Sequence, residues 1–315
     1  MTELSPKPRR RWFRFSLRTM LMLVVAVAIP LAWMVNRVRD QRAVVAELEK
    51  LDGRVTYDYQ YFESRGVILG SREPTGPKWL RSIVGDDFFA NITKVEILNE
   101  RVTDDTLAAI SRLPHLQGLE VSGDGITDKG LACLARLSEL EFLGLTSKRM
   151  TGAGLAHLKG LMRLSRLRVS APQMANDGLE HLSMMTQLQM LIIEASKVTG
   201  DGLECIAKLP TLICLCLKNT PITDTDLEHL AGVKKLKLFE LDGTKVTGSG
   251  LATIALMREL ADIRIANTPL TDTGLANLYG MQHLRNLELD KVGVTKEATD
   301  RLQEALPKCQ ITVTP

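Results

Sequence analysis

One sequence unit recurs at a fixed interval through most of the chain, and it limits the possible folds more than any other feature. Its clearest copy is LICLCLKNTPITDTDLEHLAGV, from Leu212 to Val233. The central threonine of this copy, Thr223, has counterparts every 24 residues, with Ala175 in the one remaining slot: Thr103, Thr127, Thr151, Thr199, Thr247, Thr271 and Thr295. Nine phased copies without an insertion indicate a solenoid or a propeller. The elements within each copy favour a solenoid.

Each copy has two halves with different hydrophobic periods. The first half alternates as L-x-x-L-x-L, for example at Leu212, Leu215 and Leu217, which predicts a strand buried on one face. The second half spaces apolar residues three apart, as at Leu131 and Leu134, which predicts a short helix or helical turn. Strand and helix therefore alternate once per repeat.

The threonine that opens the second half suits a helix N-cap, because its hydroxyl can accept a hydrogen bond from a backbone N–H. An aspartate often follows it and places negative charge at the positive end of the helix dipole: Asp104, Asp128, Asp224 and Asp272. Glycine recurs where a missing side chain would let neighbouring turns pack closely: positions 130, 154, 178, 202, 250 and 274. We interpret this T-D-x-G pattern as structural.

These residues resemble those of a leucine-rich repeat protein, over about seventy per cent of the chain from Ile92 to Val313. The usual asparagine after the strand is replaced here by other residues: Thr220, Thr244, Thr268, Ser196, Asp124 and Pro172. The resemblance implies an α/β horseshoe with a parallel β-sheet on the concave face and short helices on the convex face. It implies protein binding without catalysis. The T-D-x-G-L form, with the N-terminal segment described next, is similar to membrane-anchored repeat proteins of planctomycete-type bacteria.

An uncharged segment of sixteen residues, Met20 to Val35, predicts a transmembrane helix. It would be about 24 Å long, and including Leu17 to Thr19 brings it close to the roughly 30 Å hydrocarbon core. Trp12 and Trp33 stand where interfacial aromatic residues belong. Six basic residues precede the span, so the positive-inside rule predicts a single-pass protein of the cell membrane with a cytoplasmic N-terminus and extracytoplasmic repeats.

Three other interpretations of this segment remain. A signal peptide could be cleaved after Ala26-Val27-Ala28, although that leaves only about six apolar residues before the cut. Arg10-Arg11-Trp12-Phe13 partly matches a twin-arginine signal. A buried core helix conflicts with the flanking charges.

The net charge of +3 comes from the N-terminal tail. Residues 1–18 carry six basic residues against Glu3, so the rest of the chain has a slight negative balance. A body of this charge offers no general attraction for nucleic acid.

The sequence thus predicts five regions. Residues 1–16 form a basic cytoplasmic tail, 17–36 the transmembrane helix, 37–91 a juxtamembrane helix and N-terminal cap, 92–305 the repeats, and 306–315 a C-terminal cap strand. In the N-terminal cap, apolar residues predict a buried helix stripe ended by Gly53: Val38, Val45, Leu48 and Leu51. We also expect a strand around Val55, a short helix at Pro77–Val84 and a loop between them. Tyr57, Tyr59 and Trp79 could line a pocket, but we assign them to packing within this cap.

No motif for catalysis or a cofactor is present. The sequence lacks a glycine-rich phosphate loop, G-x-S-x-G and H-E-x-x-H. One column repeats potential metal ligands in five successive copies: Cys133, His157, His181, Cys205 and His229. Adjacent strands are about 4.8 Å apart, whereas zinc needs its ligands within about 2.3 Å. At most two neighbours could share an ion, so no metal site is predicted.

The five cysteines show no disulfide framework. Cys214 and Cys216 lie two apart on one predicted strand, at the outer limit of disulfide geometry and wrongly oriented. The absence of a framework fits poorly with an oxidising exterior, although cysteine is also simply a small core residue.

The concave face is the remaining candidate site. With Leu119 and Val121 in the core, residues 118, 120, 122 and their counterparts face the cavity. In the central repeats we predict that these positions bind a partner: Phe142, Arg166, Arg168, Met190, Ile192, Cys214, Cys216 and Leu238. The outer repeats are acidic there: Glu96, Glu120, Glu240, Asp242, Asp262, Glu288 and Asp290. An apolar centre with a charged rim is typical of protein interfaces, but strand propensity alone favours similar residues.

The sequence therefore indicates a non-catalytic, membrane-anchored module that binds an unidentified protein on its concave face. The alternative is a structural scaffold of the cell envelope without a single specific partner. An enzyme would need a titratable cluster in a pocket, and the sequence shows none.

Overall fold

A stack of parallel strands, one per repeat, forms the centre of the computed structural model, which describes residues 17–60, 63–64, 67–68 and 73–314. Within these residues, one 11-stranded sheet has the order β1-β4-β5-β6-β7-β8-β9-β10-β11-β12-β13. β1 is antiparallel to β4, and every later pair is parallel. The strands are β1 (Arg54–Tyr57), β4 (Ile92–Leu98), β5 (Gly118–Ser122), β6 (Phe142–Thr146), β7 (Arg166–Ser170), β8 (Met190–Glu194), β9 (Cys214–Lys218), β10 (Leu238–Asp242), β11 (Asp262–Ala266), β12 (Asn286–Asp290) and β13 (Gln310–Thr314).

The strand register follows the sequence repeat. Leu143 pairs with Leu167, and Leu167 pairs with Leu191, at a spacing of 24 residues. All three are at most 1% exposed. The leucines of each strand thus leave water by packing against those of the neighbouring repeats, as predicted.

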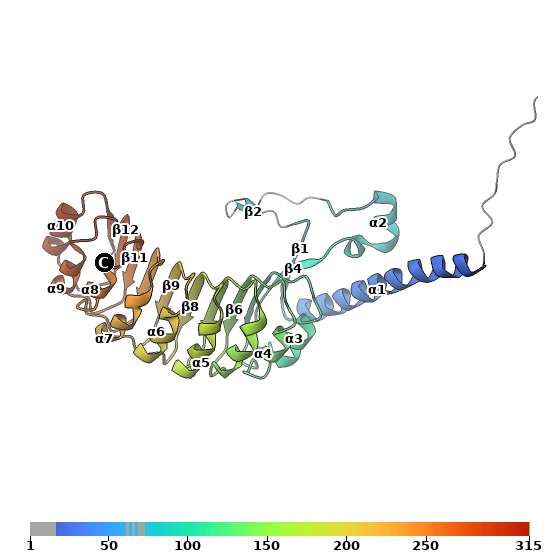
Figure 1. Ribbon diagram of the computed structural model, residues 1–315, viewed down its shortest axis with the longest axis horizontal. Helices are drawn as coiled ribbons and strands as arrows, with labels where there is room; N and C mark the ends of the chain where they lie inside the picture. Colours follow the sequence, from blue (N-terminus) through green and yellow to red (C-terminus); the bar gives the residue numbers. More distant parts are fainter. Residues whose placement is uncertain (1–16, 61–62, 65–66, 69–72, 315) are drawn as a thin grey trace, which may run out of the picture.

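Short helices connect the strands and lie on the outer side of the curved sheet (Figure 1). The chain therefore has a leucine-rich repeat solenoid fold, with the sheet on the concave face and the helices on the convex face. The helices are α3 (Asp104–Ile110), α4 (Leu131–Leu134), η2 (Ala153–Gly160), α5 (Asn176–Glu180), η3 (His181–Met184), α6 (Gly200–Ala207), α7 (Asp224–Leu227), η4 (Glu228–Gly232), α8 (Leu251–Ile254), α9 (Asp272–Leu275), η5 (Ala276–Leu278) and α10 (Lys296–Ala305), where η marks a 3-10 helix.

An aspartate at the start of the helical half joins one repeat to the next. Asp224 accepts hydrogen bonds from the backbone N–H groups of Thr247, Gly248 and Gly250, each at 2.9 Å, and from the Thr247 hydroxyl at 2.6 Å. Burial would raise the pKa of Asp224, but these four bonds stabilise the carboxylate and hold its pKa below the usual value. Asp128 makes four equivalent bonds to the following repeat.

The regularly spaced threonines thus serve two purposes. Thr271 and Thr295 accept hydrogen bonds from the N–H groups of Gly274 and Ala298, which confirms the predicted N-caps. The Thr247 hydroxyl instead donates to the aspartate of the preceding repeat. Sequence alone predicted the capping role but not this bond between repeats.

Glycines let adjacent helical turns approach one another. Gly152 has φ of +101°, and a Cβ on it would stand 2.9 Å from the Cα of Gly178 in the next repeat. Gly152 therefore meets both a conformational and a steric requirement. The predicted close packing is confirmed at Gly178, one of the repeated glycines, which meets Gly152 of the preceding repeat.

Three threonines that follow the strands bury their polar hydroxyl groups, which is unusual. Thr220, Thr244 and Thr268 are at most 5% exposed, and none of their hydroxyl oxygens has a hydrogen-bond partner in the described part of the chain. They occupy the place of the asparagine usual in such repeats. Each hydroxyl is therefore a small cost to stability.

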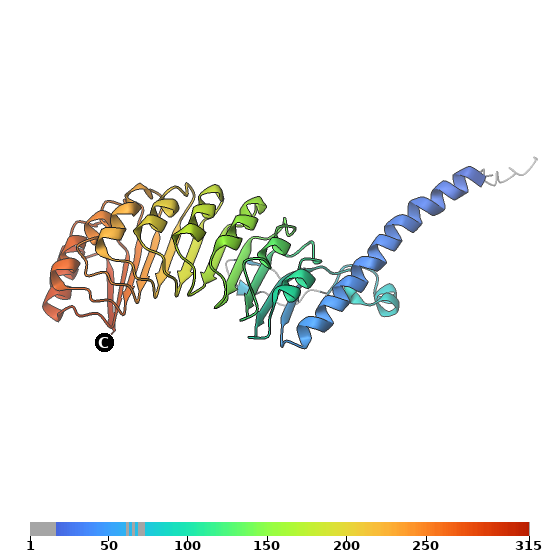
Figure 2. The same ribbon diagram turned by 90° about the horizontal axis from the view of Figure 1, so that it is seen from below.

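A single helix, α1 (Leu17–Glu49), enters the repeat domain from the N-terminal side (Figures 1 and 2). Its 33 residues include a segment that is apolar and long enough to cross a membrane, and this segment is not buried against any described residue. The C-terminal part of α1 packs on the first repeat, where its buried residues are Val38, Gln41, Val44 and Leu48. The helix is thus both the apolar segment and the first cap.

The N-terminal cap also contains β1, η1 (Asp86–Phe88) and α2 (Lys78–Val84), together with the two-stranded sheet β2 (Glu63–Ser64) and β3 (Val67–Ile68). The predicted strand and short helix are confirmed. The pair β2–β3 lies within the stretch that we expected to be a loop. The predicted basic tail, residues 1–16, lies outside the described residues.

Three details of the predicted cap were wrong. Val38 and Leu48 are buried as predicted, but Val44, at 1% exposure, takes the buried place that we assigned to Val45, which is only partly buried. Asp52, with φ of +57°, takes the left-handed position after α1 that we assigned to Gly53. Trp79 is 67% exposed and does not pack in the cap. At the other end, β13 pairs with β12 and closes the described sheet as predicted.

Candidate concave binding site

The concave side chains form columns that cross the strands. From β5 onward, the first residue of each strand is the register partner of the first residue of the next, and Lys94, the third residue of β4, pairs with the first residue of β5. These pairings align the following side chains in one column: Lys94, Gly118, Phe142, Arg166, Met190, Cys214, Leu238, Asp262, Asn286 and Gln310. From Phe142 to Leu238 the column holds apolar residues and one arginine. We call the stretch from β6 to β10 in this column the apolar band.

The members of the apolar band lie on successive strands, and Arg166 stands between Phe142 and Met190. Met190 pairs with Cys214, and Cys214 pairs with Leu238. Met190 and Leu238 are partly exposed, whereas Cys214 between them is only 7% exposed. The larger neighbours cover the smaller side chain. Cys214 therefore packs beneath the band and contributes little exposed surface for a partner to contact.

A second column, two residues further along each strand, contains Arg168, Ile192 and Cys216 and departs further from the predicted site. Ile192 and Arg168 are partly exposed, but Cys216 is only 4% exposed. The Sγ atoms of Cys214 and Cys216 are 3.7 Å apart, and all five cysteines are free. The contact with Cys214 and burial raise the pKa of Cys216, which keeps it a neutral thiol at neutral pH. The two cysteines thus form a buried thiol pair beneath the surface.

Phe142 and Arg166 form the N-terminal end of the apolar band. The Arg166 guanidinium carbon lies 5.7 Å from the centroid of the Phe142 ring, within cation–π distance. A Cβ on Gly144 would stand 3.3 Å from Cζ of Phe142, so the ring leans along the strand into space that a side chain would fill. Arg166 has no ion pair within the described residues, which leaves its charge available.

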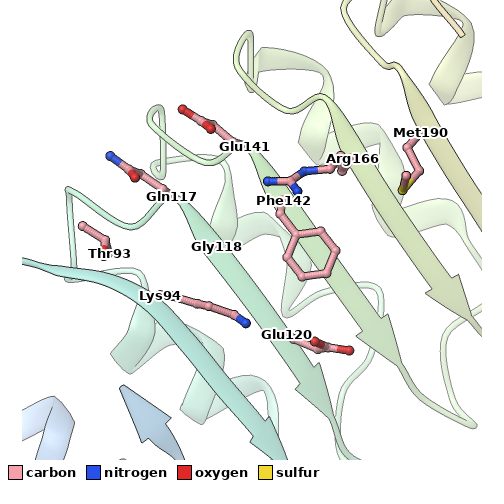
Figure 3. Close-up of a pocket in the computed structure, with 9 residues that line it drawn as sticks. All are labelled: Thr93, Lys94, Gln117, Gly118, Glu120, Glu141, Phe142, Arg166 and Met190. Carbon is pink, nitrogen blue, oxygen red and sulfur yellow. The ribbon is translucent and has the colours of Figure 1, made fainter. Parts of the chain in front are cut away.

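A pocket of about 380 Å³ lies beside Phe142, toward the first repeats. Gly118 opens it, because this strand position lacks a side chain between Lys94 and Phe142 (Figure 3). The pocket is lined by Thr93, Lys94, Gln117, Gly118, Glu120, Glu141, Phe142, Arg166 and Met190. Its walls include an aromatic ring and both charge signs, so it suits one inserted side chain with an apolar body and a polar end.

Most other concave charges are paired across strands. Arg168 contacts Glu194 at 3.0 Å and Glu120 at 3.6 Å. It reaches Glu120 across Gly144, which is the register partner of both residues. Arg264 pairs similarly with Glu288 at 2.8 Å. These partly exposed pairs stabilise the fold little, but they hold the polar surface around the apolar band in place.

The structure brings together Phe142, Arg166 and Met190 of the predicted site at one pocket. Sequence reasoning missed Thr93, Lys94, Gln117, Gly118 and Glu141 as pocket residues. Glycine inside a strand often marks a close approach or an open place on the sheet. Gly118 is therefore the residue in the sequence that could have indicated the pocket.

The column of cysteines and histidines lies in the helical half of the repeats, for example Cys133 in α4 and His181 in η3. No group of three or more histidine, cysteine, aspartate or glutamate residues within the described ranges could hold a metal ion.

Comparison with known proteins shows similarity only to solved structures. No family model matches the sequence, and no curated protein matches it. Internalin C2 of Listeria monocytogenes is 22% identical with a TM-score of 0.45, covering 65% of this chain and 81% of that one. Internalin F of the same organism is 16% identical with a TM-score of 0.45, covering 74% and 92%.

A third structure is the leucine-rich repeat ectodomain of the membrane receptor kinase GASSHO1/SCHENGEN3 from Arabidopsis thaliana, in complex with CASPARIAN STRIP INTEGRITY FACTOR 2. It is 16% identical with a TM-score of 0.44, and the match covers 71% of this chain and 27% of that one. The repeat architecture assigned here rests on the 24-residue register of the chain itself.

Proposed function

We propose that this protein is a non-catalytic, membrane-anchored module that binds another protein on its concave face. The apolar part of α1 spans the membrane, the N-terminus is cytoplasmic, and the repeats lie on the other side. The partner lies on the apolar band and places one side chain in the pocket beside Phe142. No cofactor takes part.

The observation that carries this proposal is the alignment of partly exposed apolar side chains in one column next to a pocket. Phe142, Met190 and Leu238 are partly exposed and lie in one column on the face of the sheet that the helices do not cover. Ion pairs such as Arg168–Glu194 surround the band. A central apolar area with a polar rim is the usual anatomy of a protein interface.

The membrane assignment has separate support. An exposed apolar surface on α1 would be unfavourable in water, and side chains such as Leu21 and Met22 are 66% and 71% exposed. The basic residues before α1 favour retention of the N-terminus in the cytoplasm. Protease accessibility in intact cells tests the side: the repeats should be cleaved by added protease, and protection of the repeats would contradict the proposed topology.

The binding proposal is tested with Met190→Glu combined with Leu238→Glu. The two charges would be placed in the centre of the interface, where they would lose hydration without a partner. We expect loss of partner capture from solubilised native membranes, with an unchanged circular dichroism spectrum. The matched control is Met162→Glu with Leu256→Glu, because both residues are highly exposed, at 73% and 77%, and lie outside the concave strands.

Unchanged capture by the concave double variant would refute binding at the band. If only the control variant lost interactions, the scaffold alternative would account for the protein better, because its contacts would then lie outside the concave face.

A further inference from the structure

The short helix α2 exposes two large apolar side chains that the repeat fold does not explain. Trp79 is 67% exposed and Ile83 is 73% exposed, and no residue of α2 is buried. At about 100° per residue, positions four apart lie on the same face of a helix. Trp79 and Ile83 therefore form one outward apolar face, although the sequence predicted that Trp79 packs inside the cap.

The opposite face of α2 is fixed to the protein. Arg81, two residues from both Trp79 and Ile83, is only 14% exposed at its side chain. Its Nε lies 2.7 Å from Asp86, and its Nη1 lies 3.2 Å from Glu73. Because Arg81 binds Asp86 and Glu73 on the inner face of α2, the opposite face with Trp79 and Ile83 points away from the cap.

The end of α2 and the turn after it are tied to α1 where its apolar segment ends. Arg42 donates to the carbonyl of Val84 at 3.1 Å, and Arg37 donates to the carbonyl of Phe88 at 3.1 Å. Arg37 follows Val35, the last residue of the uncharged run, by only two positions. If α1 spans a bilayer, these arginines lie at its headgroup region, and so does the segment that they hold.

Both views place α2 beyond the first repeat and beside α1, not over the helices of the repeats (Figures 1 and 2). α1 also has an exposed tryptophan close to these arginines. Trp33 is 61% exposed, and the guanidinium carbon of Arg37 lies 5.8 Å from the centroid of its ring. Tryptophan is enriched at the membrane–water interface, where an apolar ring with one N–H donor is favourable.

We infer that α2 is a second membrane contact, with Trp79 and Ile83 seated in the interfacial layer of the lipid bilayer on the side of the repeats. This inference rests on the proposed membrane span of α1. A single helix can rotate and tilt, whereas a helix with a lateral interfacial contact has a fixed orientation. The contact therefore sets the direction in which the concave face points.

The test uses the full chain in proteoliposomes with one tryptophan at a time. The sequence has three tryptophans, so Trp12→Phe with Trp33→Phe leaves Trp79 alone. Lipids brominated near the headgroup should quench Trp79 emission, while iodide in the aqueous phase should quench it weakly. The control is a chain whose three tryptophans are phenylalanine and which carries Leu256→Trp. We expect that reporter to respond to iodide and not to bromolipid.

A Trp33 reporter separates this inference from the membrane span itself. Quenching of Trp33 by bromolipid together with free access of iodide to Trp79 would overturn the role of α2 and leave the span intact. If bromolipid quenched neither reporter, both the membrane span of α1 and the membrane contact of α2 would be refuted. Bromolipid quenching of both supports the inference.

Discussion

The bonds between repeats through Asp224 allow a quantitative test of how the solenoid is held together. Asp224→Ala removes the acceptor for three backbone N–H groups and the Thr247 hydroxyl in the next repeat. The alanine also removes the negative charge in the first turn of α7. Both effects should lower the free energy of unfolding.

The magnitude follows from the number and kind of bonds. A hydrogen bond contributes about 0.5–1.5 kcal/mol net, and more when the acceptor is charged. Since Asp224 is partly exposed and water can replace some of its bonds, four bonds amount to about 2–4 kcal/mol. The loss of the helix-dipole interaction adds about 0.3–1 kcal/mol.

The matched control is Asp201→Ala. Asp201 lies in the first turn of α6 and is exposed, and it makes no hydrogen bond to another described repeat. It reports the dipole effect alone. The difference between the two variants therefore isolates the bonds between repeats.

Urea unfolding of the full chain in detergent, followed by circular dichroism, measures both variants. Because a solenoid is stabilised by nearest-neighbour interfaces, Asp224→Ala should also broaden the transition as the repeats before and after it unfold less cooperatively. If Asp224→Ala and Asp201→Ala differed by less than about 0.5 kcal/mol, which is the usual effect of a surface substitution, the bonds would not join the repeats energetically.

Three further predictions concern the same repeats. Gly152→Ala should destabilise the chain by at least about 2 kcal/mol, from its positive φ and the approach of Gly178, whereas Gly160→Ala, with no atom near its Cβ, should change thermal unfolding little. Thr244→Val should be neutral or stabilise by up to about 1 kcal/mol, because its buried hydroxyl lacks a hydrogen-bond partner among the described residues. Thr211→Val, which loses donation to two carbonyls, should destabilise, and destabilisation by both would refute the distinction. The stability gap between the native chain and Asp224→Ala should be full above about pH 4 and shrink as pH falls through the lowered pKa of the folded carboxyl; a gap that widens in acid would contradict the pKa direction.

The sequence predicted the strands and their register well because both depend on a single periodic requirement. Each L-x-x-L-x-L segment can bury its leucines only against the copy 24 residues away, as Leu143 and Leu167 do. A fixed repeat length without insertions then determines every pairing. The columns of the concave face follow directly from that register.

Contacts between repeats were harder to predict, because they depend on side-chain directions in the helical half. Thr247 has the sequence context of an N-cap, yet its hydroxyl donates to Asp224 across the gap between repeats. Similarly, Cys214 was predicted to be exposed but is covered by Met190 and Leu238, since a small side chain between larger ones loses contact with water. Such effects need the neighbouring strands in place.

The N-terminal cap lies outside the repeat, so periodicity gave no help there. Trp79 was assigned to cap packing because a terminal repeat needs a cap over its apolar face, and nothing in its local sequence indicated which face of α2 would be held by Arg81. The pocket beside Phe142 was missed for a related reason: it arises from the missing side chain of Gly118 on the neighbouring strand.

The most direct test of the proposed binding surface is site-specific photocrosslinking in intact cells. A photoreactive amino acid in place of Phe142 should form a crosslink to one protein, and Met190→Glu with Leu238→Glu should abolish it. The same probe in place of Leu256, which is 77% exposed outside the concave strands, should not form that crosslink. Crosslinking of the same protein from Leu256 but not from Phe142 would contradict binding on the concave face.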